Sequence, residues 1–221
     1  MSSQPQFGMQ VALTGLRGRG YMPDVVFDIG AADGSWTRQA LNIWPNARYF
    51  CFEPLVERRA VLESLAAERV GQVSIQPYGV GDADTELPLG VTNFLWDSSF
   101  AYGGSSARNV SVRKLDSLFA EGVIPRPSFV KIDVQGFEKR VIEGGERVLA
   151  NTDFVLMECT FIAFCDEMRT LDKSIAFMSE RELVPYEFVD FLRRPLDGAM
   201  GQCDILFIRK SHPLISNRKW G

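Results

Sequence analysis

The stretch Asp28-Ile29-Gly30-Ala31-Ala32-Asp33-Gly34 follows a short apolar run at residues 25–27 and precedes a helix-like segment at residues 35–44. Gly30 lets the backbone turn sharply and approach a ligand closely, and Gly34 starts the helix without a side chain in the way. The two glycines are not spaced as in the dinucleotide motif GxGxxG, and no P-loop lysine follows them, so the turn is not typical of phosphate binding. An acid directly before the first glycine suits a cationic ligand instead. The stretch therefore predicts a strand, a ligand-binding turn and a helix, although a plain strand-to-helix turn would use the same residues.

Strand-like and helix-like segments alternate outward from this turn along most of the chain. Such alternation predicts a mostly parallel sheet that is covered by helices on both faces and binds ligands at the carboxyl ends of its strands. The last two strands are joined by a loop that contains Pro195 and Gly198, so we expect them to form an antiparallel pair. The predicted strands cover residues 25–28, 49–53, 73–76, 129–133, 153–158, 186–192 and 204–209, and the predicted helices cover residues 8–17, 35–44, 56–68, 115–121, 137–150 and 171–182.

Acidic residues follow two of the predicted strands at the edge where ligands bind in such sheets. Glu53 lies 19 residues after Gly34, is followed by Pro54, and can accept two hydrogen bonds from the hydroxyls of a ribose. Asp82, directly after Gly81, can accept a hydrogen bond from an adenine amino group, although a type I turn explains both residues about as well. These positions are therefore candidates for binding a nucleoside.

Asp133 and Glu158 end two further strands, and they are the best candidates for a catalytic base or for metal ligands. Lys131 lies on the same side of its strand as Asp133, because side chains alternate with a period of two. Helix capping or an ion pair is the alternative role for these acids. The one histidine, His212, follows the last predicted strand, so a histidine base is not expected.

The segment at residues 82–112 is rich in Gly, Ser and Asn and is longer than a simple α/β unit needs. It contains two short strand-like runs, at residues 85–91 and 109–112. We expect this inserted segment to shape the binding site of an acceptor substrate, with Trp96, Ser98 and Ser99 as contacts. A surface hairpin without a role is the alternative.

The composition restricts the class of protein. The chain has 221 residues, of which 46% are hydrophobic, and a formal net charge of −4; this suits one domain at residues 1–221, beginning with a helix or arm at residues 1–20. No basic stripe is present, so nucleic acid is not an expected partner. The four cysteines form no CxxC pair, so neither a zinc site nor a disulfide framework is expected. Because the sequence shows neither a signal peptide nor a long apolar run, we expect a cytoplasmic protein without a membrane span, whose oligomeric state the sequence leaves open.

The order of these motifs resembles the FkbM-type family of S-adenosylmethionine-dependent methyltransferases. The matching stretches are VVFDIGAADGSWT (25–37), CFEP (51–54), VRKLDSL (112–118), VKIDVQGFEKRVIEGG (130–145) and VLMECT (155–160). The resemblance implies a Rossmann-like class I methyltransferase fold, which is α/β with a mostly parallel seven-stranded sheet and an antiparallel last strand. It also implies that the Asp28–Gly34 turn and Glu53 bind S-adenosylmethionine. Gln135 takes a position where the family has Glu or Gln, and its amide is not expected to act in catalysis or metal binding.

The activity that the resemblance implies is methyl transfer to oxygen, commonly to a hydroxyl of a sugar or a secondary metabolite. We expect direct displacement, in which the acceptor oxygen attacks the methyl group while Asp133 or Glu158 takes the hydroxyl proton and Lys131 orients Asp133 or the acceptor. A metal-free reaction is favoured, because no further ligands complete a cation site. One alternative is a nucleotide-dependent oxidoreductase on a similar sheet, which the missing GxGxxG spacing disfavours. The other is a non-catalytic binding module that kept the cofactor pocket.

Overall fold

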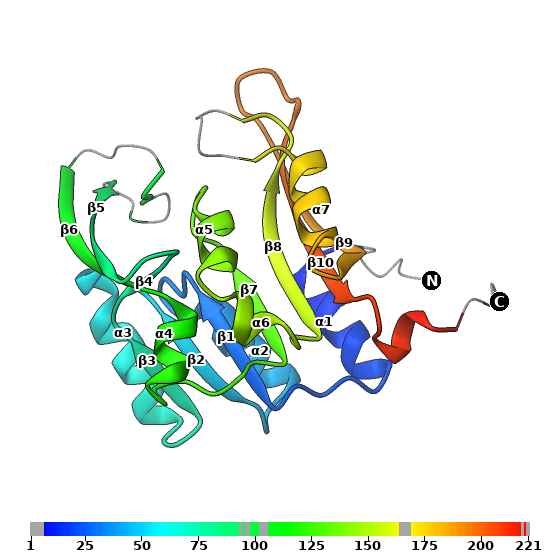
Figure 1. The fold of residues 1–221 in the computed structure, drawn as a ribbon, viewed down its shortest axis with the longest axis horizontal. Coiled ribbons are helices and arrows are strands. Elements are labelled where there is room, and N and C mark those ends of the chain that lie inside the picture. The colour runs from blue at the N-terminus through cyan, green and yellow to red at the C-terminus, as the bar shows by residue number, and fades with distance from the viewer. Residues whose placement is uncertain are drawn as a thin grey trace, which may run out of the picture.

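A computed structural model describes residues 7–92, 95, 98–101, 106–163, 169–217 and 219 of the chain. Its centre is a seven-stranded sheet with the order β3-β2-β1-β7-β8-β10-β9 (Figure 1). Six strands run in one direction, and β10 runs antiparallel to both of its neighbours. The predicted fold class, a mostly parallel sheet with an antiparallel last strand, is therefore confirmed. The strands are β1 (Val25–Ile29), β2 (Arg48–Phe52), β3 (Val73–Gln76), β7 (Phe129–Ile132), β8 (Phe154–Thr160), β9 (Leu183–Arg193) and β10 (Met200–Arg209).

Helices cover both faces of this sheet (Figure 1). Because strand side chains alternate between faces, β1 directs Val26 to one face and Phe27 to the other, and the two lie in separate buried clusters. The first three helices bury side chains in the cluster of Val26, and the next four bury theirs in the cluster of Phe27. The helices are α1 (Met9–Gly18), α2 (Ser35–Ile43), α3 (Val56–Glu68), α4 (Leu115–Ala120), α5 (Glu138–Glu143), α6 (Glu146–Leu149) and α7 (Leu171–Ser179), and a 3-10 turn follows at Pro213–Ile215.

The prediction of a single helix at residues 137–150 is wrong, because two short helices occupy this region. α5 ends at Glu143 and α6 begins at Glu146, with Gly144 and Gly145 between them. A Cβ atom on Gly144 would lie only 1.8 Å from the carbonyl oxygen of Gly81. The backbone therefore passes so close to the Gly81 turn that a side chain is excluded, and the pair of glycines interrupts the helix.

The segment at residues 82–112 belongs to a second, three-stranded sheet with the order β4-β6-β5. The two strand-like runs form an antiparallel pair, β5 (Thr85–Val91) and β6 (Ser106–Arg113), with β6 longer than predicted. β4 (Gly79–Val80) adds a parallel strand to β6. Leu89 and Val91 form a small buried cluster with Leu55, the second residue after Glu53. This packing fixes the second sheet beside the carboxyl end of β2.

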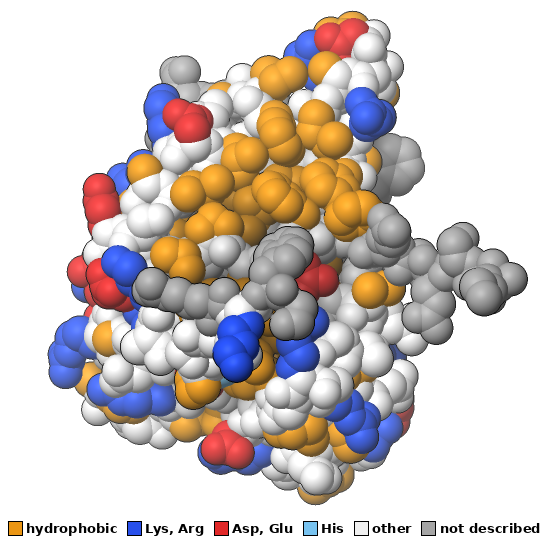
Figure 2. Space-filling view, turned by 90° about the vertical axis from the view of Figure 1, so that its right-hand side faces the viewer, with side chains coloured by type: hydrophobic (Ala, Val, Ile, Leu, Met, Phe, Trp, Pro, Cys, Tyr) orange, Lys and Arg blue, Asp and Glu red, His pale blue; other side chains and the backbone are white. Residues whose placement is uncertain are grey.

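The edge strand β9 has exposed hydrophobic side chains. Phe188 and Phe191 stack with their ring centroids 5.7 Å apart, and Leu192 is also exposed. Figure 2 shows that hydrophobic side chains gather on this side of the molecule. Within the described part of the chain, no helix is long and apolar enough to cross a membrane.

Candidate active site

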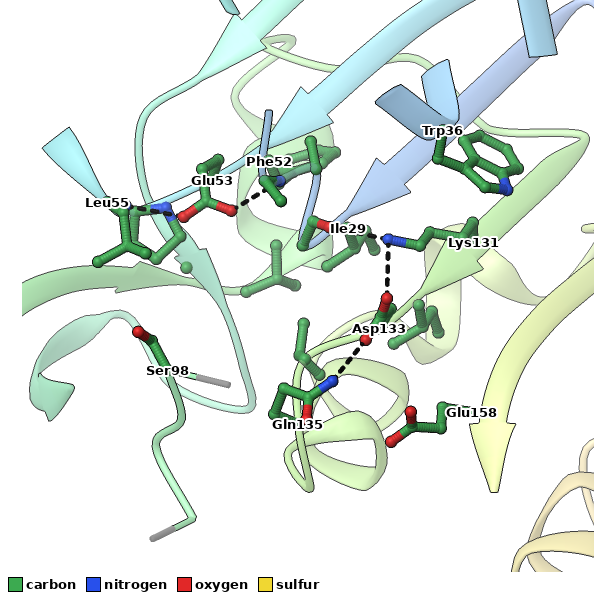
Figure 3. A pocket seen from close by; sticks show the side chains of 18 of the residues that line it. Ile29, Trp36, Phe52, Glu53, Leu55, Ser98, Lys131, Asp133, Gln135 and Glu158 are labelled. Atoms are coloured by element: carbon green, nitrogen blue, oxygen red, sulfur yellow. Dashed lines mark hydrogen bonds and ion pairs between the residues drawn. The ribbon is translucent and has the colours of Figure 1, made fainter. Parts of the chain in front are cut away.

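A pocket lies at the carboxyl ends of β1, β2, β7 and β8, where the parallel sheet predicts ligand binding (Figure 3). The turn after β1 forms one part of its wall, and Glu53 and Pro54 after β2 form the next part. The opposite part is formed by Lys131, Asp133 and Glu158. The pocket therefore joins residues that were predicted to bind a cofactor to residues that were predicted to be catalytic.

The turn after β1 is held tightly between two neighbouring strands. The amides of Gly30 and Ala31 both donate to the carbonyl oxygen of Phe52, each at 3.0 Å. Gly30 has a φ of +78°, and a Cβ atom there would lie 1.9 Å from the carbonyl oxygen of Asp133. Gly30, Ala31 and Ala32 line the pocket with backbone and methyl groups. This part of the wall can therefore approach a ligand closely.

Asp28 lies beneath the pocket wall and not in it, which corrects its expected contact with a cationic cofactor. Its side chain is 0% exposed, and it accepts a hydrogen bond of 2.6 Å from the Thr37 hydroxyl. The second carboxyl oxygen lies 3.2 Å from Nζ of Lys131. Asp28 points towards α2 because its side chain is on the Val26 face of β1. It therefore holds Lys131 and does not line the pocket.

Four other expected cofactor contacts also lie outside the pocket wall. Asp33 accepts a hydrogen bond of 3.0 Å from the Ser35 amide at the start of α2, and Gly34 packs against Leu65. Asp82 forms an ion pair of 3.3 Å with Arg140. Gly81 is likewise absent from the wall, where Gly79 and Val80 of β4 are present instead. Of the predicted stretch Gly79-Val80-Gly81-Asp82, the first two residues therefore line the pocket and the last two do not.

Glu53 lies in the pocket wall as predicted, with only 6% of its surface exposed. One carboxyl oxygen accepts the amide hydrogen of Ala32 at 2.9 Å, and the other accepts that of Leu55, also at 2.9 Å. Burial raises its pKa, and these two backbone bonds oppose the shift. Because each oxygen has a second lone pair, the fixed carboxyl group can still accept hydrogen bonds from a ligand.

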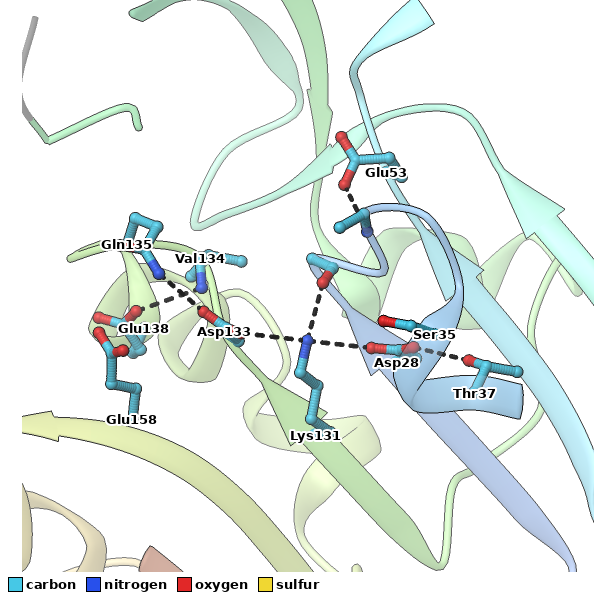
Figure 4. A network of polar contacts seen from close by, with 12 residues as sticks. Asp28, Ser35, Thr37, Glu53, Lys131, Asp133, Val134, Gln135, Glu138 and Glu158 are labelled. Atoms are coloured by element: carbon cyan, nitrogen blue, oxygen red, sulfur yellow. Dashed lines mark hydrogen bonds and ion pairs between the residues drawn. The ribbon is translucent and has the colours of Figure 1, made fainter. Parts of the chain in front are cut away.

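Lys131 ties the two halves of the pocket together (Figure 4). Its Nζ atom lies 2.8 Å from the carbonyl oxygen of Gly30, 3.2 Å from Asp28 and 3.4 Å from Asp133. Burial lowers its pKa, but the negative charges of Asp28 and Asp133 outweigh burial, and the pKa is raised above its ordinary value. Lys131 is therefore a fixed ammonium group that positions the turn and Asp133.

Asp133 reaches the pocket from the loop after β7, and its side chain is 43% exposed. Besides Lys131, it accepts a hydrogen bond of 2.9 Å from the side-chain amide of Gln135. Gln135 has a φ of +54°, a conformation that is uncommon for residues other than glycine. The half-buried Glu138 accepts hydrogen bonds from the amides of Val134 and Gly136, at 3.3 and 3.0 Å, and holds this loop in place. Asp133 is therefore held from two sides while it remains accessible from the pocket.

Glu158 and Asp204 face each other on the neighbouring strands β8 and β10, and both line the pocket. Glu158 accepts a hydrogen bond of 2.5 Å from the side-chain amide of Gln202. Burial, together with the negative charges of Asp133, Glu138 and Asp204, raises the pKa of Glu158 to about 9. Burial and the charge of Asp133 raise the pKa of Asp204 to about 6. At neutral pH Glu158 is therefore protonated and Asp204 is mainly ionised.

Asp204 is a site residue that was not predicted from the sequence. It opens the predicted strand at residues 204–209 and has the same parity as the buried residues Leu206 and Ile208. That parity was a usable signal, because it places Asp204 on one face of the sheet with them. Its position opposite Glu158 depends on the pairing of strands that are far apart in the sequence.

The inserted segment contributes Ser98 and Phe100 to the pocket wall. Ser99 does not face the pocket, which corrects its expected role as a substrate contact. It is 1% exposed, and its hydroxyl donates a hydrogen bond of 2.5 Å to the carbonyl oxygen of Gln135. Ser99 therefore fastens the inserted segment to the loop that carries Asp133. Trp96, the third expected contact, lies outside the described residues.

Comparison with known proteins decides the family. The methyltransferase FkbM domain matches residues 28–181 of the chain. The chain belongs to the FkbM methyltransferase family. The match contains both the turn after β1 and the loop after β7, so the predicted resemblance is confirmed.

Two curated relatives of this FkbM chain are methyltransferases by name. The 2-O-methyltransferase NoeI of Sinorhizobium fredii is 31% identical over 156 residues, which cover 62% of this chain and 63% of the relative. The hexuronic acid methyltransferase AglP of Haloferax volcanii is 24% identical over 135 residues, which cover 61% of this chain and 55% of the relative. The chain therefore spans less than two thirds of the length of either relative.

The crystal structure of a methyltransferase FkbM from Methylobacillus flagellatus KT has the same fold. It superposes with a TM-score of 0.53 at 14% sequence identity, over 82% of this chain and 43% of that one. Among the described residues of this FkbM chain, no three His, Cys, Asp or Glu side chains are grouped so that they can hold a metal ion.

The shifted pKa of Glu158 gives a prediction about stability. Its folded-state pKa of about 9 lies above that of a carboxyl group in an unfolded chain, so the folded state binds this proton more tightly. The stability it contributes is fully present below the unfolded pKa and is lost as the pH rises towards the folded value. Glu158→Gln keeps the neutral shape, so we expect wild type to lose melting temperature relative to this variant between about pH 5 and about pH 9.

Thermal melts of both proteins across this pH range test the prediction. Asp204 is present in both, so the difference reports the titration of Glu158 together with its coupling to Asp204. Glu63→Gln is the matched control, because Glu63 is an exposed acid on α3. A difference between wild type and Glu158→Gln that does not change with pH would contradict a raised pKa at this position.

Proposed function

We propose that the chain transfers the methyl group of S-adenosylmethionine to a hydroxyl oxygen of a small acceptor, a sugar or a secondary metabolite, by direct displacement. The observation that carries this proposal is the continuous pocket from the turn after β1 and Glu53 to Asp133 and Glu158. Membership of the FkbM family supports methyl transfer. The name of the relative NoeI, a 2-O-methyltransferase, supports oxygen as the acceptor atom.

The residues at one end of the pocket suit S-adenosylmethionine. Glu53 offers free lone pairs to the hydroxyls of a ribose while two backbone amides hold it in place. Phe52, Leu55 and Val80 provide an apolar surface for the adenine ring. Gly30 allows the backbone to approach the rest of the cofactor without a side chain in between. When bound, S-adenosylmethionine supplies an electrophilic methyl group on a positively charged sulfur.

Asp133 is the residue that we assign to the acceptor proton. Its carboxylate is accessible from the pocket, and Lys131 and Gln135 fix its orientation. Glu158 is protonated at neutral pH, so it donates a hydrogen bond to the acceptor and does not act as the base. The ammonium group of Lys131 already contacts three oxygen atoms of the protein, so none of its three N–H groups is left for a ligand. Lys131 is therefore a positioning residue. Alignment of the acceptor oxygen by these groups is expected to supply much of the rate acceleration.

Glu53→Gln is expected to weaken binding of S-adenosylmethionine by about tenfold or more, because a charge-assisted hydrogen bond to a hydroxyl is worth about 1.5–3 kcal/mol. The amide nitrogen of Gln cannot accept a hydrogen bond, and it also faces a backbone N–H group of Ala32 or Leu55. Calorimetric titration measures the affinity, and Glu63→Gln on the exposed side of α3 is the control for charge alone. Equal affinities of the Glu53 variant and wild type would remove Glu53 from the cofactor site.

The experiment that tests the proposed function has two steps. Calorimetry first compares S-adenosylmethionine with a nicotinamide dinucleotide, and we expect binding of the former only. The purified chain is then incubated with methyl-labelled S-adenosylmethionine and a panel of sugars and glycosylated metabolites. Transfer of the label to oxygen supports the proposal. Binding without transfer to any member of the panel would favour a binding module that lacks catalysis.

A further inference from the structure

The acceptor end of the pocket carries three carboxyl groups. Asp133 follows β7, and Glu158 and Asp204 lie on β8 and β10. These three strands are neighbours in the sheet, and all three carboxyl groups line the pocket. Figure 3 shows Asp133 and Glu158 facing the same space. At neutral pH the protonated Glu158 can donate a hydrogen bond, whereas the ionised Asp204 can only accept one. This pair of neighbouring groups matches adjacent hydroxyls, each of which can donate and accept.

Among the described residues, the wall of this pocket holds no free positive charge at this end, although Lys139 and Arg169 line a small neighbouring pocket that shares Glu158. Among the described residues that line the pocket, Lys131 is the one cationic side chain, and its Nζ atom already contacts Gly30, Asp28 and Asp133. The described residues of the inserted segment that line the pocket, Leu89, Leu95, Ser98 and Phe100, carry no charge. Besides carboxyl and hydroxyl groups, the described wall offers the side-chain amide of Gln135 and the indole of Trp36, and no free cation.

A carboxylate on the acceptor would be disfavoured in this environment. Removing an ionised carboxylate from water costs several kcal/mol unless a cation or several donors replace the water. Asp133 and Asp204 would add repulsion between like charges, which costs several kcal/mol at an interface. A neutral hydroxyl would instead donate to Asp204 in a charge-assisted hydrogen bond.

We infer that the acceptor is a polyhydroxy compound without a negative charge, that Asp204 recognises one of its hydroxyls, and that uronic acids are rejected. This inference rests on the proposed methyl transfer and names the class of acceptor for the same pocket. The inferred acceptor differs from the one in the name of the relative AglP, a hexuronic acid methyltransferase. The recognition is a property of Asp204 on β10, outside the family match at residues 28–181.

Matched pairs of sugars test the class of acceptor. Methyl glycosides of glucose, galactose and mannose are each compared with the corresponding uronic acid and the 2-amino sugar, at saturating S-adenosylmethionine. We expect at least one neutral or amino member to be methylated, with kcat/KM at least about tenfold above that of its uronic acid, as for one lost charge-assisted hydrogen bond. A uronic acid methylated as well as its neutral counterpart overturns the inference, and so does a panel in which only uronic acids are methylated; a panel without any methylation counts against the proposed function instead.

Asp204→Asn tests the assigned residue. We expect kcat/KM for the neutral acceptor to fall about tenfold and the preference over the uronic acid to shrink by a similar factor, with the affinity for S-adenosylmethionine unchanged. Asp190→Asn is the matched control, because Asp190 pairs with Asp204 across β9 and β10 but is exposed and does not line this pocket. Unchanged selectivity in Asp204→Asn, or an equal effect of Asp190→Asn, overturns the role of Asp204. If the wild-type protein does not bind S-adenosylmethionine, the proposed function is refuted instead.

Discussion

Replacement of Gly30 by Ala is expected to reduce the affinity for S-adenosylmethionine at least about a hundredfold, equivalent to about 3 kcal/mol. The Cβ atom of Ala would lie 1.9 Å from the carbonyl oxygen of Asp133, which is backbone and cannot rotate away. The turn after β1 must therefore separate from the end of β7. That separation also breaks the contact between Lys131 and the Gly30 carbonyl oxygen, so both ends of the pocket change shape.

The same substitution is expected to lower the free energy of unfolding by about 2–5 kcal/mol, because left-handed strain of about 1–2 kcal/mol adds to overpacking of about 1–3 kcal/mol. Gly71→Ala is the matched control. Gly71 has a φ of +76°, close to that of Gly30, and no atom lies within 4 Å of the added Cβ. The control therefore experiences the strain without the collision, and it should lose about 1 kcal/mol and keep its affinity.

Denaturant unfolding and calorimetric titration on the folded fraction of both variants measure these effects. If Gly30→Ala bound S-adenosylmethionine as tightly as Gly71→Ala does, the turn after β1 would not form the cofactor pocket. If both variants lost equal stability, the close approach to Asp133 would not be a feature of the folded protein.

The arrangement of strands was predictable because it depends on local patterns. Apolar runs that alternate with amphipathic segments gave the parallel sheet, and the acids at strand ends marked the edge that holds the pocket. Glu53, Asp133 and Glu158 line the pocket for this reason. The antiparallel last strand was also predictable, since a loop with Pro195 and Gly198 joins β9 and β10.

The partners of individual side chains were less predictable, because they depend on contacts between distant segments. Asp28 is opposite Lys131 in the register of β1 and β7, and this pairing converts an expected ligand contact into a buried ion pair. Asp204 is opposite Glu158 in the register of β8 and β10. Local sequence gives the face of each side chain, but the order of the strands decides which groups meet on that face.

Ser99 and the break between α5 and α6 show a second limit. Ser99 lies in a polar stretch typical of a surface loop, yet a bridge to Gly90 and the hydrogen bond to Gln135 bury it. Gly144 has a conformation that any residue can adopt, with a φ of −74°. Only the approach of the Gly81 carbonyl oxygen explains the glycine, and that contact joins segments about sixty residues apart in the sequence.

Asp133→Asn is expected to lower kcat by about 10²–10⁴, the usual contribution of a positioned general base. Asn has nearly the same shape, so the loop held by Glu138 should keep its conformation. It cannot accept a proton, and its amide group would replace one of the two oxygens that now accept from Lys131 and Gln135. We expect the affinity for S-adenosylmethionine to stay within about threefold of wild type, because the change concerns the acceptor end of the pocket.

The variant Glu158→Gln is the control for Asp133→Asn. Because Glu158 is protonated at neutral pH, Gln replaces a neutral group by another neutral group, and its amide can still donate a hydrogen bond. Most of kcat should therefore remain in Glu158→Gln while it is lost in Asp133→Asn. Single-turnover rates at saturating S-adenosylmethionine, with and without a chelator, measure both variants, and a metal-free reaction predicts no effect of the chelator. The reverse order of the two variants would make Glu158 the base, whereas loss of turnover with the chelator and its recovery with magnesium or manganese would make a bound metal part of the reaction.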